Sequence, residues 1–148
     1  MIVRGISRAD YLAIVKVLDD WWGGPSPERA SPFFFYELGE QALIAEQDGE
    51  LVGFLLGFLT SSREMGYVHL VGIHPEHRKH GVGKRLYLHF ADSCREAGAK
   101  RIKAISTIGH ETADRFHRAL GFEAEEARDY AGPGRHRVLF TLDLQGPT

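Results

Sequence analysis

The residue types best suited to chemistry gather in the segment Leu70 to Leu86, which reads LVGIHPEHRKHGVGKRL. An apolar run predicts a strand, Pro75 ends it, and a basic loop containing Gly81 and Gly83 then leads into a predicted helix. The first N–H groups of a helix lack partners within the helix, and the helix dipole gives them partial positive charge. Glycines let a bulky ligand approach the backbone closely. The segment therefore predicts a binding site for an anion such as a phosphate group.

The spacing within this loop distinguishes between phosphate-binding motifs. A dinucleotide fingerprint needs a third glycine where this chain has Leu86. A Walker loop needs glycine in place of Arg78 and serine or threonine in place of Arg85. The pattern that matches is R-x-x-G-x-G over 78–83, directly after the strand and its proline. An ordinary surface loop before a helix, and a binder of ATP or NAD phosphates, are the alternatives.

This pattern resembles the acetyl-CoA signature of the GNAT acyltransferases (GCN5-related N-acetyltransferases), and the similarity covers most of the chain. The segment 110–122 resembles a second family signature, with the family's alanine and glycine–phenylalanine pair in their expected places. His110 stands where the family has asparagine, and His117 stands where it has tyrosine. The hairpin predicted over 44–54 also resembles the second and third strands of the family.

The resemblance implies an acetyl-CoA-dependent N-acetyltransferase that transfers the acetyl group directly to an amine of a small molecule or peptide. Backbone groups of the fourth strand would hold the pantetheine arm, and loop N–H groups would hold the pyrophosphate. The cofactor-binding residues that it implies are Val71, Gly72, Ile73, Arg78, Lys79, His80, Gly81, Val82, Gly83, Lys84, His110 and His117. Direct transfer needs no covalent enzyme intermediate, so we expect Cys94, on an apolar helix face, to be a core residue.

Two histidines are candidates for the proton transfers of this reaction. His69 precedes Val71 by two residues, so we expect both side chains on one face of the strand, near the position of the family's base. Histidine titrates near neutrality, so His69 could accept the proton of an ammonium group. His117 shares a predicted helix face with Phe116 and Leu120, and could protonate the coenzyme thiolate in place of tyrosine. Structural roles are the alternatives: a half-buried strand residue for His69, and a core histidine bonded to a backbone carbonyl for His117.

The candidate acceptor-binding residues are Trp22, Phe35, Glu37 and His69. Aromatic side chains would form the walls of an acceptor pocket, and Glu37 would attract an ammonium group. The same aromatic segment also fits a hydrophobic lid packed on the sheet. Polyamines, amino-acid derivatives, antibiotics and protein amines all remain open as acceptors. The alternative function is a non-catalytic acyl-CoA binding or sensing module that kept the coenzyme site and lost the tyrosine.

Hydrophobic periodicity and turn signals predict the elements that must position these residues. Ser7 and Asp10 are spaced as in a capping box, and Asp48-Gly49 predicts a two-residue hairpin turn. The predicted strands are 2–6, 41–47, 51–59, 67–73, 101–106, 122–127 and 136–144, and the predicted helices are 7–19, about 32–39, 83–97 and 110–120. This order predicts a single α+β (α/β-like) domain over 1–148. The resemblance implies the GNAT fold: a central mixed, mostly antiparallel sheet of about seven strands, flanked by about four helices and splayed between strands 4 and 5.

Charge and composition exclude several classes of protein. The chain has 18 Lys+Arg and 20 Asp+Glu, a net charge of -2, which argues against nucleic-acid binding and against an anionic membrane surface. The longest apolar run, 51–59, is less than half of the ~20 residues that a membrane helix needs. His74, His77 and His80 lie in a loop without the periodicity or carboxylates of a metal site, so we expect no metal. We therefore expect a cytoplasmic protein whose partners are acetyl-CoA and an amine acceptor; a homodimer is compatible with this.

Overall fold

A computed structural model describes residues 1–22, 36, 37 and 39–145. Its frame is a seven-stranded sheet in the order β1-β2-β3-β4-β5-β7-β6. The strands are β1 Ile2–Gly5, β2 Leu43–Gln47, β3 Glu50–Leu59, β4 Met65–Ile73, β5 Arg101–Thr107, β6 Glu123–Ala127 and β7 Arg137–Asp143. The neighbours β4 and β5 run parallel, and the other neighbouring pairs of the sheet run antiparallel. The predicted mixed, mostly antiparallel sheet is thus confirmed.

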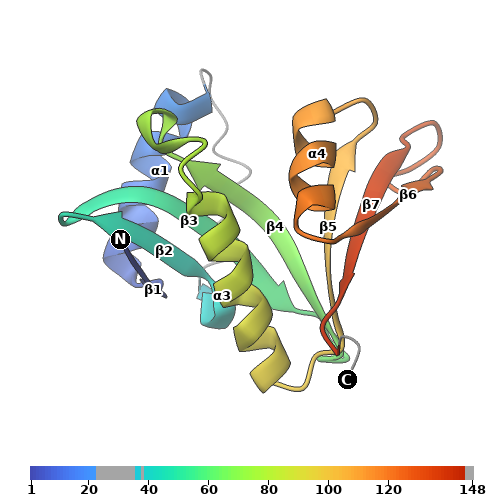
Figure 1. The fold of residues 1–148 in the computed structure, drawn as a ribbon, viewed down its shortest axis with the longest axis horizontal. Helices are drawn as coiled ribbons and strands as arrows, with labels where there is room; N and C mark the ends of the chain where they lie inside the picture. The colour runs from blue at the N-terminus through green and yellow to red at the C-terminus, as the bar shows by residue number, and fades with distance from the viewer. Residues whose placement is uncertain (23–35, 38, 146–148) are drawn as a thin grey trace.

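Helices cover both faces of this sheet (Figure 1). The α-helices are α1 Arg8–Trp22, α3 Val82–Glu96 and α4 Glu111–Ala119, and the short 3-10 helices are η2 Gly39–Gln41 and η3 Pro75–His77. Within the described part of the chain no helix is long and apolar enough to cross a membrane. The further helix expected over about 32–39 falls almost entirely on residues outside the described ranges.

The sheet separates two hydrophobic clusters. One cluster, beneath α1, includes Leu18 and Trp21 from the helix and Phe54 from β3. The other, beneath α3 and α4, includes Phe90 from α3 and Phe140 from β7. The Trp21 ring stacks on Phe54 with centroids 5.9 Å apart. This packing holds α1 in helical form beyond residue 19, where the periodicity predicted its end.

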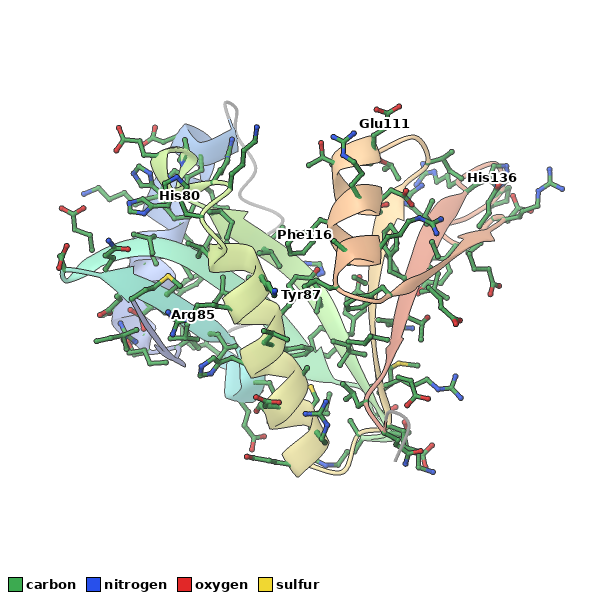
Figure 2. All side chains as sticks on the ribbon, in the orientation of Figure 1. His80, Arg85, Tyr87, Glu111, Phe116 and His136 are labelled. Atoms are coloured by element: carbon green, nitrogen blue, oxygen red, sulfur yellow. The ribbon has the colours of Figure 1, made fainter. Side chains whose placement is uncertain are left out.

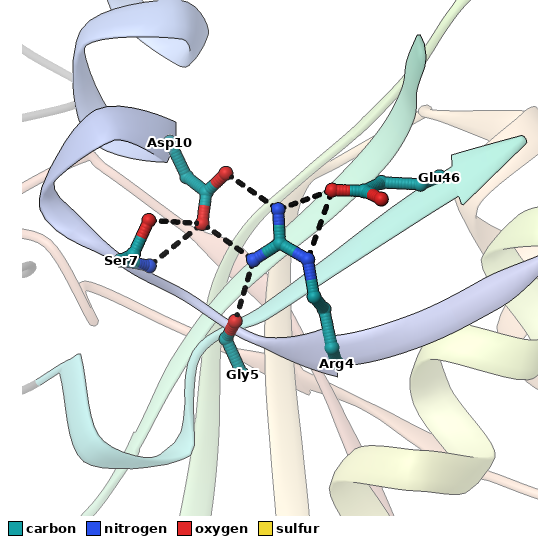
Figure 3. Close-up of polar contacts among 5 residues, drawn as sticks. All are labelled: Arg4, Gly5, Ser7, Asp10 and Glu46. Carbon is teal, nitrogen blue, oxygen red and sulfur yellow. Dashed lines mark hydrogen bonds and ion pairs between the residues drawn. The ribbon is translucent and has the colours of Figure 1, made fainter. Parts of the chain in front are cut away.

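The first turn of α1 is tied to the sheet by a network of charged groups (Figure 3). The Asp10 carboxylate accepts the backbone N–H of Ser7 at 2.7 Å, which is the reciprocal arm of the predicted capping box. The Ser7 hydroxyl donates to the same carboxylate at 2.8 Å. Arg4 on β1 donates two hydrogen bonds to Asp10, at 2.7 and 2.8 Å, and also binds Glu46 on β2. These bonds fix the start of α1 against the strands β1 and β2.

A bulge in β4 reverses the alternation of its side chains. Leu56 pairs with Leu70 and Gly57 pairs with Val68, so His69 is an extra residue on its strand. Val68 packs in the cluster beneath α3, whereas Leu70 packs in the cluster beneath α1. The extra residue therefore shifts the two-residue period by one position.

This shift corrects one sequence-based expectation. Val71 packs on the α3 side of the sheet. The His69 ring lies beside Tyr67, at 6.1 Å between centroids, and Tyr67 lies 5.3 Å from Phe58, which continues the α1-facing row of β3. His69 and Val71 thus lie on opposite faces, and not on one face as their spacing predicted.

Candidate active site

The candidate site begins where β4 and β5 separate. Their parallel pairing runs from Met65 with Arg101 to Val68 with Ala104 and ends there. Beyond this point β4 continues along β3, while β5 continues along β7. The space between the diverging strands belongs to a cavity of about 660 Å³, which we call the slot. The slot is lined by Tyr67, Val68, His69, Leu70, Val71, Tyr87, Ala104, Ile105, Ser106, Thr107, His110, Ala113, His117 and Arg137.

The edge of β4 in the slot is suited to pairing with an extended ligand. Among the described strands, Val71, Gly72 and Ile73 pair with β3 on one side only, and no described strand pairs with their edge that faces β5. Val71 and Ile73 pack their side chains against the α3 cluster. A Cβ on Gly72 would lie 2.4 Å from the Phe54 ring, so this position must be glycine for the strand to pack. The side chains of this segment therefore pack within the protein, and its backbone N–H and C=O groups on the edge that faces β5 are available to a ligand.

The loop before α3 has the geometry of an anion cradle. Gly81 is the N-cap residue, in the left-handed conformation (φ 81°), and no side chain of the described residues caps this helix end. A Cβ at Gly81 would meet no atom of the described residues within 4 Å, so these residues leave space beside the first N–H groups of α3. Lys79 is also left-handed (φ 67°), and successive N–H groups in such a turn converge on an anion. The residues present therefore fit a phosphate group.

The cradle and the slot lie beside each other. A Cβ on Gly83, in the first turn of α3, would lie 3.3 Å from the Phe116 ring on α4 and 3.9 Å from the tip of Ile73 at the end of β4. Figure 2 shows Phe116 and Tyr87 facing one another between α4 and α3, and their ring centroids are 5.2 Å apart. One elongated ligand can therefore place a phosphate at the cradle and its arm along β4.

Two side chains of the loop before α3, those of Arg78 and His80, point away from the cradle. The Arg78 guanidinium donates to the carbonyl oxygen of Trp21 at 2.8 Å and to that of Ile73 at 3.3 Å. This side chain thus ties the loop to the end of α1. His80 lines a separate cavity of about 420 Å³ that also includes Met1 and Arg85. Figure 2 shows Arg85 on the side of α3 turned away from α4.

The histidines of α4 lie in the slot. His110 is the N-cap residue of α4, and its Nδ1 accepts the backbone N–H of Ala113 at 3.2 Å. His117 is 7% exposed, which confirms the inward direction that its helix face predicted. Its ring stacks on Phe140 with centroids 4.2 Å apart and an angle of 8°.

Both ring nitrogens of His117 are hydrogen-bonded. Nδ1 lies 2.7 Å from the carbonyl oxygen of Ala113, and Nε2 lies 2.8 Å from the hydroxyl of Tyr87. A carbonyl only accepts, so Nδ1 carries a proton. Desolvation by burial lowers the pKa of His117, against opposing contributions from the Ala113 bond and from Asp114. In its neutral state the ring therefore accepts the Tyr87 proton at Nε2.

Tyr87 is the site residue that sequence reasoning missed. It lies on α3, is 5% exposed, and its pKa is raised by burial. Helical periodicity could have indicated this residue, because Tyr87 follows Gly83 by four residues and so lies on the same side of α3. A hydroxyl on an otherwise apolar helix face needs a partner, and the partner is His117.

The remaining residues considered in the sequence analysis are the acceptor-binding candidates, Cys94 and the loop histidines. Glu37 is exposed, whereas the Trp22 side chain and Phe35 lie outside the described part of the structure. Cys94 lies on the buried face of α3, and burial raises its thiol pKa to about 12. The rings of His74 and His77 lie 5.3 Å apart, but no three metal-ligating side chains gather anywhere among the described residues.

A cradle for phosphate beside an open parallel-strand edge defines a site for a long ligand with a phosphate group at one end, as in coenzyme A. Residues 11–122 match the model of the acetyltransferase (GNAT) family, and this chain belongs to that family. It is accordingly an acyltransferase, as the R-x-x-G-x-G loop and the 110–122 segment indicated.

Similarity to individual proteins agrees with this assignment. The L-methionine sulfoximine/L-methionine sulfone acetyltransferase of Salmonella typhimurium is 26% identical, over 98% of this chain and 94% of that protein. The structure of Ard1 from Thermoplasma volcanium shares the fold with a TM-score of 0.79, at 19% identity and 96% coverage of both chains. The yncA protein of Salmonella typhimurium, a putative acetyltransferase solved with its cofactor acetyl-CoA, has a TM-score of 0.74, at 18% identity over 99% of this chain and 95% of that one.

Proposed function

We propose that this protein, working as one domain over 1–148, transfers the acetyl group of acetyl-CoA directly to an amine of a small molecule or peptide. The observation that carries the proposal is the open edge of β4 with the uncapped start of α3 beside it. An edge strand takes an extended arm, and a helix start takes phosphate, so the pair suits a ligand that has both. Acetyl-CoA supplies its acyl group as a thioester, which is activated for attack by a neutral amine.

The coenzyme would be held mainly by backbone groups. The N–H groups from Lys79 to Lys84, including those of His80, Gly81, Val82 and Gly83, would bind the pyrophosphate. The backbone of Val71, Gly72 and Ile73 would pair with the pantetheine arm along the open strand edge. His110 uses Nδ1 to cap α4, so its Nε2 is the atom available for a further contact with that arm. Arg78 would contribute by fixing the loop through its bond to Trp21.

Proton transfer is assigned to His69 and His117, two of the three histidines that line the slot. His69, at the bulge where the strands separate, would accept a proton from the attacking amine. Its placement on the α1 face puts this base on the side of the sheet opposite α3 and the cradle. The amine and the coenzyme would thus enter the slot from opposite faces of the sheet. His117 would supply the proton that the departing thiolate needs.

The acceptor would bind at the slot from the α1 face of the sheet. Glu37 is proposed to attract the ammonium group, and Trp22 and Phe35 to contact the acceptor. The relative from Salmonella typhimurium acts, by its name, on the amino-acid derivatives L-methionine sulfoximine and L-methionine sulfone. Amino-acid derivatives therefore belong among the first acceptors to test here.

A thiol-release assay over a panel of amines tests the proposal. The panel holds amino-acid derivatives, polyamines, aminoglycosides and short peptides, each with acetyl-CoA and with acetyl-CoA omitted. We expect release of free thiol with at least one amine, together with a product heavier by one acetyl group. Tight coenzyme binding without turnover of any amine would instead support the sensing module. A shift in melting temperature with ATP or NAD, and none with coenzyme A, would support the nucleotide binder.

The proposal places the reaction in the cytoplasm and uses no metal, nucleic acid or membrane. Activity that is unchanged by a chelator such as EDTA would agree with the absence of a metal step. A homodimer is compatible with the proposal, and light scattering of the purified protein measures the assembly directly.

A further inference from the structure

Resting on the proposed acetyl transfer, we infer that Tyr87 and His117 form one proton-donating pair, in which the Tyr87 hydroxyl donates to the coenzyme sulfur and His117 supplies and orients that proton. The pair joins two helices, since Tyr87 lies on α3 and His117 lies on α4. Their contact is a buried hydrogen bond of 2.8 Å between the Tyr87 hydroxyl and Nε2 of His117. Both side chains line the slot.

The geometry argues against direct donation by His117. Nδ1 is held by the Ala113 carbonyl, and Nε2 is directed at Tyr87, so neither nitrogen faces the ligand space without losing its partner. Rotation of the ring is opposed by the stack on Phe140 and by the edge contacts with Phe116 and Phe122, at 5.4 and 5.2 Å. The hydroxyl of Tyr87 is therefore the group through which a proton of this pair reaches the slot.

The protonation state of His117 decides what Tyr87 can do. With a neutral ring, Tyr87 donates its proton to Nε2 and offers the slot only oxygen lone pairs. With an imidazolium ring, Nε2–H donates to the Tyr87 oxygen, and the phenolic proton is free to point at the sulfur. Burial of Tyr87 raises its pKa, so it would give up this proton only while receiving another. The two residues must therefore act together.

The proton transfers balance as follows. The amine nitrogen forms a bond to the acyl carbon, and the C–S bond breaks with its electron pair remaining on sulfur. Sulfur takes the proton of the Tyr87 hydroxyl, and the Tyr87 oxygen takes the Nε2 proton of His117. The ring returns to the neutral state with its proton on Nδ1. His69 receives the proton that the amine nitrogen loses, and exchange with water restores both histidines.

Negative charge that develops on sulfur favours the imidazolium and so opposes the desolvation that keeps His117 neutral in the free protein. The pair therefore predicts a decline of kcat at high pH, where His117 is no longer protonated. Among the described residues, the other titratable or charged groups that face the ring or the slot are His110 at the start of α4, Asp114 on α4, Tyr67 and His69 on β4, and Arg137 on β7.

Conservative variants test the pair. Tyr87→Phe keeps the ring that packs on Phe116 and removes the hydroxyl alone. His117→Phe keeps a ring to stack on Phe140 and removes both nitrogens. We expect each variant to lower kcat by about 10²-fold, with little change in the KM for acetyl-CoA, and to lose the high-pH decline. The double variant should be no slower than the slower single variant, because both residues serve one transfer. Tyr11→Phe, a partly buried tyrosine on α1, is the matched control and should keep wild-type kcat.

A binding measurement tests the same contact without turnover. Calorimetry compares coenzyme A with its analogue that lacks the sulfur atom. We expect the wild type to prefer coenzyme A by about two- to tenfold, the scale of one hydrogen bond between neutral groups, here from the thiol S–H to the Tyr87 oxygen, and Tyr87→Phe to show no preference. An unchanged preference in Tyr87→Phe, or kcat within twofold of the wild type, overturns the inference. If the wild type itself releases no thiol with any amine, the proposed function fails, and the calorimetric ratio still decides whether Tyr87 contacts the sulfur.

Discussion

Gly81 provides a direct test of the cradle, because a matched glycine lies at the other end of the same helix. Gly81 precedes α3 with φ 81°, and Gly98 follows it with φ 94°. At both positions an added Cβ would meet no atom within 4 Å in the part of the chain that the structure describes. Alanine at either position should therefore cost only the left-handed backbone penalty, about 1–2 kcal/mol. For a chain of this length that corresponds to a melting temperature lower by roughly 3–8 °C.

The two variants should differ in their binding of coenzyme A. The methyl group of Gly81→Ala would project into the approach to the first N–H groups of α3, where the phosphate is proposed to lie. A phosphate that is displaced from one such N–H loses about 1.5–3 kcal/mol, so the Kd should rise by about tenfold or more. Gly98→Ala should bind with wild-type affinity. Isothermal calorimetry with coenzyme A measures both constants, and differential scanning calorimetry measures both stabilities.

Equal stability losses with unchanged affinity in both variants would refute the cradle, because the added methyl group at Gly81 would then have met no ligand. Gly81→Val makes the test more stringent, since its branched side chain fills more of the same open space. An affinity loss shared by Gly98→Ala would show that general destabilisation, and not the phosphate contact, lowers binding.

Three further predictions concern the frame of the site and its base. The bonds to Arg4 and Ser7 lower the pKa of Asp10 from 3.8 to about 2, so its carboxylate stabilises the fold above pH ~4, and this contribution disappears as the pH falls towards 2. Urea unfolding should accordingly show Asp10→Asn less stable than the wild type by about 2 kcal/mol at pH 6 and nearly equal to it at pH 2; a gap that persists at pH 2 would contradict this assignment. His69→Ala should remove the low-pH limb of the pH–rate profile, and a retained limb would mean that another group is the base. Gly66→Ala places a Cβ 2.6 Å from Sγ of Cys94, so it should lose about 1–3 kcal/mol in the same urea assay, a loss that the additional change Cys94→Ala should partly reverse.

Local features of the structure could be predicted because they depend on neighbours in the chain. The turn at Asp48-Gly49 has the positive φ angles, 53° and 80°, that this residue pair favours in a two-residue hairpin loop. The N–H of Ser7 is bound by Asp10, three residues later. The glycine-containing loop predicted from the R-x-x-G-x-G spacing does lead into α3, with Gly81 as the N-cap residue. Each of these features spans only a few residues, so composition and spacing are sufficient.

Other parts of the site depend on residues that are far apart in the sequence, and only the folded chain decides them. The bulge at His69 arises from pairing between β3 and β4, and it moves this side chain to the opposite face from Val71. Arg78 finds its acceptor on Trp21, 57 residues away.

The contrast is clearest at His117. Motif spacing and helical periodicity were enough to predict that this residue replaces the family's tyrosine on the inward face of a helix. They could not show that Tyr87, 30 residues earlier, would donate a hydroxyl proton to its ring. Helical periodicity gives the direction of each side chain about its own helix axis, whereas the packing of α3 against α4 decides which side chains meet. The partner of His117, and so the route proposed for its proton, is therefore a property of the tertiary structure.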